Sequence, residues 1–150
     1  MDIHLGDVNH TIQLAIAPVF LLTGIGTKLM VLTNRLARII DRSRVLEERL
    51  TKNGGDRESS HDFEELATLY RRSHLINRAI TLSTSSALMI CLMIAALFIG
   101  SALDIGLTKS IAALFVLAMM ALIGSFIFFL REILVATATM SIRRVPGIES

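Results

Sequence analysis

Three long apolar stretches are separated by one stretch rich in charge. Thr11–Thr33, Leu82–Leu103 and Ile111–Leu130 each provide the roughly 20 apolar residues that a helix needs to cross a bilayer. The 46 residues Asn34–Ala79 carry 10 of the 15 Lys and Arg residues and 8 of the 13 Asp and Glu residues. This pattern predicts an all-α membrane protein with three transmembrane helices and one water-exposed insert between spans one and two.

Within the insert, apolar side chains repeat at the three- and four-residue spacing of a coiled-coil seam. The two runs are Leu36, Ile39, Ser43, Leu46 and Leu50, and Leu66, Leu69, Ser73, Ile76 and Ile80. Between them, the sequence Asn-Gly-Gly-Asp at Asn53–Asp56 favours a turn. The insert is therefore predicted to form an antiparallel helical hairpin over about residues 34–80.

The hairpin is expected to be continuous with the first two spans. No proline occurs from residue 19 to residue 144, so nothing forces a break where spans and hairpin meet. Three spans and a hairpin use nearly the whole length, which predicts a single membrane domain, residues 1–150. Each arm has only a narrow apolar seam, and an isolated helical pair buries little surface. We therefore expect arms of neighbouring copies to pack together in a homo-oligomer.

Composition and charge support a membrane protein and argue against a soluble domain or a nucleic-acid-binding protein. Hydrophobic residues make up 53% of the chain, above the roughly 45–50% of soluble domains. The net charge of +2, with basic and acidic residues interleaved, argues against a nucleic-acid partner. The single cysteine, Cys91, permits no intramolecular disulfide and is interpreted as a small buried apolar residue.

The distribution of Lys and Arg predicts the orientation. The insert and the segment after the third span hold 13 of these residues, whereas the opposite side has only Lys109. Basic residues near the ends of spans collect in the cytoplasm. We therefore expect a multi-pass membrane protein with its N-terminus outside and the hairpin and C-terminus in the cytoplasm.

Polar and small residues within the spans are the candidates for a pore or cavity lining. They are Pro18, Thr23, Gly24, Gly26 and Thr27 in the first span, and Ser83, Ser85 and Ser86 in the second. Proline and glycine in the first span indicate either a gate or a kinked, closely packed helix. The hydroxyls of the second span indicate either a polar constriction between copies or hydrogen bonds between helices.

Basic residues at the membrane surface form a second candidate set. Asn34, Arg35, Arg38, Arg71, Arg72 and Arg78 are predicted to anchor the protein among anionic headgroups, or alternatively to form a basic vestibule for ions. Lys28 lies inside the first span but toward its cytoplasmic end. Its side chain either extends to the membrane surface or contacts a pore or substrate.

No catalytic motif, metal-ligand spacing or cofactor-binding motif is visible, so we expect neither an enzyme nor a bound cofactor. The leading hypothesis is a homo-oligomer that encloses an ion-conducting pore or polar cavity. The alternative is a non-conducting scaffold whose hairpin binds a partner. Under both hypotheses we expect the lipid bilayer and further copies of the chain as partners. The pore hypothesis adds ions.

The segments Ile12–Gly26 and Leu32–Arg42 carry a resemblance, and Arg71-Arg72 and Asn77–Ile80 fit the same pattern. The chain resembles a family of small bacterial inner-membrane proteins catalogued as a domain of unknown function. At Lys28 the resemblance leads us to expect an apolar or small residue instead of a lysine. The resemblance implies a bacterial three-span protein and brings no activity with it.

Overall fold

The computed structural model describes residues 5–52, 57–103 and 106–142, and side chains within 9–52, 62–103 and 106–137. Three α-helices account for nearly all of the described chain: α1 (Leu5–Lys52), α2 (Arg57–Leu103) and α3 (Thr108–Ile142). Each is long and apolar enough to cross a membrane. The all-helical prediction is thus confirmed for the described residues, and three such helices are consistent with a multi-pass membrane protein. The predicted turn at 53–56 lies outside the described residues.

The first two helices run without interruption from the apolar stretches into the charged insert. α1 has 48 residues and passes through Pro18, and α2 has 47, so each extends about 70 Å. This exceeds the roughly 30 Å hydrocarbon core of a bilayer. The predicted continuity of spans and hairpin arms is confirmed. We call residues 34–52 and 57–80, the parts of α1 and α2 beyond the apolar stretches, the charged arms.

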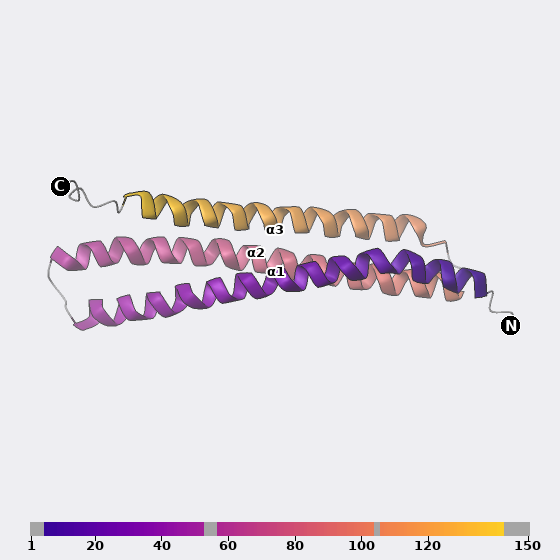
Figure 1. The fold of residues 1–150 in the computed structure, drawn as a ribbon, viewed down its shortest axis with the longest axis horizontal. Helices are drawn as coiled ribbons and strands as arrows, with labels where there is room; N and C mark the ends of the chain where they lie inside the picture. The colour runs from indigo at the N-terminus through magenta and orange to yellow at the C-terminus, as the bar shows by residue number, and fades with distance from the viewer. Residues whose placement is uncertain (1–4, 53–56, 104–105, 143–150) are drawn as a thin grey trace, which may run out of the picture.

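The third helix extends further than the apolar pattern indicated. The predicted span stopped at Leu130, but α3 continues to Ile142. It runs antiparallel to α2, lies beside the charged arms and ends before their tips (Figure 1). The reason is that residues 133–136, Ile-Leu-Val-Ala, favour continued packing after the charged pair Arg131-Glu132.

The middle helix, α2, packs against both of its neighbours, as Figure 1 shows. Among the described residues, no Cα atoms of α1 and α3 approach within 8 Å of each other. Where α1 and α3 interact, long side chains make the contacts. We expected neighbouring copies to support the hairpin because two isolated arms bury little surface. In the structure, α3 is a third helix of the same chain that packs beside them. A homo-oligomer remains a prediction.

One heptad pattern of burial runs along α1 from Thr11 to Leu46. The buried positions Thr11, Pro18, Ile25, Leu32, Ile39 and Leu46 follow each other at intervals of seven residues. A seven-residue repeat keeps one face of a helix toward its neighbour over many turns. The same packing geometry therefore continues from the membrane into the charged arm.

The two apolar stripes predicted for the hairpin meet in one hydrophobic cluster. Its buried members are Leu32, Ile39, Leu46, Leu69, Ile76 and Ala79, with Leu36, Leu66 and Ile80 packed against them. Polar contacts flank the cluster, because Arg42 Nε donates to Glu65 at 2.9 Å and the Tyr70 hydroxyl donates to Glu47 at 2.7 Å. The Arg42–Glu65 contact raises the pKa of the Arg42 guanidinium.

Cys91 is exposed, so its interpretation as a buried residue is wrong. Ile90 occupies the buried seam of α2, and the next residue of a helix points about 100° away. The thiol therefore faces away from both neighbouring helices.

The Tyr70–Glu47 contact makes the pairing of the charged arms measurable. The hydrogen bond to Glu47, followed by the charge of that carboxylate, raises the pKa of Tyr70. Because Tyr70 is the only tyrosine and the chain has no tryptophan, ultraviolet absorbance titration reads this phenol alone. We expect its midpoint above the ordinary value of about 10, and a lower midpoint in Glu47→Gln. A raised folded pKa means that the contact stabilises the fold at neutral pH and is lost as pH rises through that pKa. Equal midpoints in both proteins contradict the pairing.

Candidate functional site

The main polar feature of the molecule is a carboxylate buried where the three helices face one another. Glu132 of α3 has a side chain that is 0% exposed. It follows the predicted third span by two residues, at the level where the charged arms begin. An ionised group is buried at this position only because it is paired and hydrogen-bonded.

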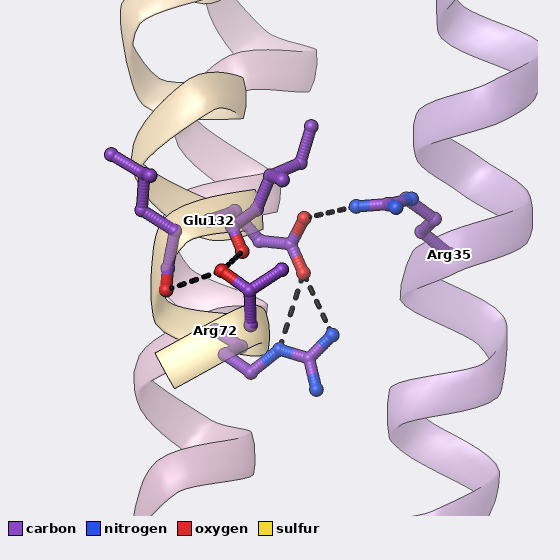
Figure 2. A network of polar contacts seen from close by, with 6 residues as sticks. Arg35, Arg72 and Glu132 are labelled. Carbon is purple, nitrogen blue, oxygen red and sulfur yellow. Dashed lines mark hydrogen bonds and ion pairs between the residues drawn. The ribbon is translucent and has the colours of Figure 1, made fainter. Parts of the chain in front are cut away.

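Two arginines from different helices hold this carboxylate. Arg35 of α1 donates through Nη1 to Oε2 at 2.5 Å. Arg72 of α2 donates through Nε at 3.1 Å and Nη2 at 2.8 Å, both to Oε1. Figure 2 shows Glu132 between the two guanidinium groups, with each oxygen facing a different helix. We call Arg35, Arg72 and Glu132 the charge triad.

The triad connects helices whose backbones do not touch. The Arg35–Glu132 pair joins α1 to α3, and the Arg72–Glu132 pair joins α2 to α3. Without Glu132 the two arginines would face each other with like charge. The carboxylate therefore compensates two cations at once, and the ring of Phe129 lies 5.4 Å from the Arg35 guanidinium carbon as a further cation–π contact.

A second polar layer lies seven residues deeper in the membrane. Ser125 is seven residues before Glu132, and Lys28 is seven before Arg35. Lys28 Nζ donates to Ser125 Oγ at 2.8 Å, and the Ser83 hydroxyl lies 2.7 Å from the same oxygen. Ser125 in turn donates to the carbonyl of Ala79 at 2.5 Å. Seven residues are two helical turns, so this layer lies about 10 Å below the triad.

Small residues at the same interval let α2 and α3 approach closely. Ser86 donates to the carbonyl of Ala118 at 2.7 Å, one more heptad into the membrane. Beside Ser125, a Cβ added to Gly124 would lie 3.3 Å from Leu82 Cδ1. Small side chains and hydroxyl donors at helix contacts are typical of membrane helix packing.

The predicted pore-lining residues are divided between two environments. Ser83 and Ser86 are fully buried between α2 and α3, and Ser85 is half-buried. Pro18 is buried against α2, whereas Thr23, Gly24, Gly26 and Thr27 are exposed on α1. Thr23 and Thr27 donate to backbone carbonyls of their own helix. The structure therefore does not bring the two halves of the predicted lining together in one chain.

The predicted surface anchors are divided as well. Arg35 and Arg72 belong to the charge triad, while Asn34, Arg38, Arg71 and Arg78 are exposed. Arg78 lies over the ring of Phe128, with its guanidinium carbon 5.9 Å from the centroid. Lys28 has partners within the chain, because its ammonium also lies 3.6 Å from the centroid of Phe126.

Sequence reasoning did not find Glu132. Its only signal was that it is the sole acidic residue between Asp104 and Glu149, in an apolar segment that continues on both sides. Such a carboxylate on a helix that stays buried requires a cationic partner. Which arginines supply it depends on the register of three helices, and an apolar pattern does not specify that register.

Comparison with known proteins identifies the family of the chain. A family model described as a protein of unknown function (DUF2721) matches residues 15–142. This range includes the charge triad, the layer around Ser125 and most of all three helices. Comparisons with curated proteins and with solved structures found no match.

Proposed function

The chain belongs to this DUF2721 family, and from its geometry we propose a structural membrane protein that self-associates through α1 and has no enzymatic activity. The observation that carries the proposal is the uncovered outer face of α1 within the apolar stretch. α1 packs against α2 alone along its backbone, which leaves its other face to lipid or to another copy.

That outer face combines small residues with hydroxyls. Gly24 has no atom within 4 Å of an added Cβ, and Phe20, one turn before it, is 73% exposed. Gly26 is also open but points about 160° away from Gly24. Thr23 and Thr27 are exposed on the same turns. Such surfaces suit close contact between membrane helices. A second copy is the favoured occupant because identical faces can pair about a twofold axis.

The charged arms of α1 and α2, together with the end of α3, then form a three-helix extension of each membrane domain. The charge triad ties them at their base, and exposed apolar residues such as Phe63 (60%) and Ile40 (41%) offer contacts to further proteins. From the distribution of Lys and Arg, we place these arms in the cytoplasm and the start of α1 outside.

Disulfide trapping tests self-association. In a Cys91→Ala background, Gly24→Cys is expected to form a covalent dimer on mild oxidation in native membranes, because open space above Gly24 accepts the side chain. Val116→Cys, which is 59% exposed on α3, is the matched control. No dimer from Gly24→Cys, or equal yields from both variants, contradicts contact through α1.

An oligomeric pore is the second candidate function. The exposed Thr23 and Thr27 favour it, since several copies meeting through α1 would place these hydroxyls around an axis. Ion flux into liposomes tests it: reconstituted protein is expected to conduct if copies enclose water, and Thr27→Leu is expected to reduce that flux. Trapped oligomers without flux favour the structural role.

A further inference from the structure

The seam between α1 and α3 is lined by cationic and aromatic side chains. No Cα atoms of the two helices come within 8 Å in the described chain, so side chains alone bridge them. The bridges are Lys28 to Ser125 and Arg35 to Glu132, with Phe126 and Phe129 beside the two cations. Both cations project from one face of α1, seven residues apart.

This seam carries an excess of positive charge. Arg35, Arg72 and Lys28 contribute three positive charges, and Glu132 contributes one negative charge. In the described residues, no carboxylate lies within ion-pair distance of Lys28. Its hydrogen-bond partner, Ser125, is neutral. A cation inside the apolar part of a bilayer is costly without a counter-charge, by about 2.5–3.5 kcal/mol at the centre.

Both cations have donors left for a ligand. A lysine ammonium has three N–H groups and an arginine guanidinium has five. Arg35 donates to Glu132 through Nη1, and its side chain remains 38% exposed. Lys28 is half-buried and lies five residues before the predicted end of the first span, about 8 Å below the surface.

We infer that Lys28 binds the phosphate of an anionic phospholipid in the seam between α1 and α3, while Arg35, two helical turns nearer the surface, adds to the positive charge that attracts it. Basic sites between membrane helices on the positively charged side suit such headgroups. A lipid is favoured over a soluble anion because Lys28 lies within the apolar stretch and the adjacent Phe126 is 51% exposed. That ring offers contact to an acyl chain while the phosphate meets the Lys28 ammonium.

Native mass spectrometry of the full chain tests this inference. The protein is placed in phosphatidylcholine nanodiscs with increasing phosphatidylglycerol, and retained phosphatidylglycerol is counted per chain. Lys28→Met is expected to weaken this retention about tenfold or more, because it removes a charge-assisted hydrogen bond to the phosphate. Arg38→Met removes one exposed charge near the same surface, and we expect it to change retention less than about threefold. Lys28→Arg is expected to keep the preference.

Three results would overturn the inference. Equal retention in Lys28→Met and Arg38→Met would mean that only the general surface charge attracts the lipid. Competition by inorganic phosphate at equal concentration would identify a soluble anion as the ligand. Loss of helix packing in Lys28→Met, measured by detergent-induced unfolding, together with no preference in the wild type, would make Lys28 a purely structural residue.

Discussion

Glu132→Ala is expected to lower the free energy of unfolding by about 3 kcal/mol, the largest effect of any single substitution considered. Removing one member of a buried ion pair costs about 3–5 kcal/mol because it leaves charge without compensation. The lower end applies here, since Arg35 and Arg72 remain 38% and 25% exposed. Unfolding in mixed micelles of increasing sodium dodecyl sulfate measures the change.

The matched control is Glu48→Ala. Glu48 pairs with Lys52 at 2.6 Å on one helix, and both side chains are about 70% exposed, at 68% and 71%. Exposed pairs of this kind contribute about 0.3–0.5 kcal/mol. If Glu132→Ala destabilises the protein no more than Glu48→Ala does, the triad does not hold the three helices together.

A triple replacement separates charge compensation from packing. Arg35→Met, Arg72→Met and Glu132→Leu together remove the charges while keeping apolar volume. Replacement of buried ion pairs by apolar residues is often neutral or stabilising. We therefore expect the triple variant to be more stable than Glu132→Ala alone. If the triple variant is less stable than Glu132→Ala, the hydrogen-bonded arrangement of the triad itself stabilises the fold.

Ser125→Leu is expected to cost about 1–3 kcal/mol by overpacking the contact between α2 and α3. Ser125 is fully buried, and its hydroxyl meets Lys28, Ser83 and the carbonyl of Ala79. A leucine there pushes α3 away from α2 and removes these contacts. The same detergent titration measures the loss.

Ser125→Ala controls for the hydroxyl. It keeps the side chain small and removes the hydrogen bonds, which in membrane proteins contribute about 0.6 kcal/mol each. The difference between the leucine and alanine variants therefore reports volume alone. Equal stability of the two variants means that close approach at this level is not what holds α3 to α2.

The long helices were predictable because their signals are local. Runs of about 20 apolar residues indicate spans whatever surrounds them, and the absence of proline indicates continuity. The seam from Leu36 to Leu50 was visible for the same reason, since its spacing reflects the turn of a single helix. The third span was predicted to end at Leu130, and α3 continues 12 residues beyond it, because a span is bounded by membrane thickness whereas the helix packs on along α2.

The roles of individual polar residues were not predictable in this way. Ser83, grouped in the sequence with possible pore-lining hydroxyls, contacts Ser125, which lies 42 residues away in the chain. Arg35, grouped with surface anchors, neutralises a carboxylate 97 residues away. Neighbouring residues in a sequence share a helix but face different directions, so their functions diverge once the helices pack.

Hydropathy and charge along the chain are sufficient to establish three helices, their approximate lengths and the location of the charged arms. These properties follow from the cost of placing residues in lipid or in water, which each segment meets independently. The charge triad, the layer around Ser125 and the separation of α1 from α3 arise only in the tertiary structure. They depend on the relative register of three helices, and that register is set by side-chain packing across contacts that join distant parts of the chain.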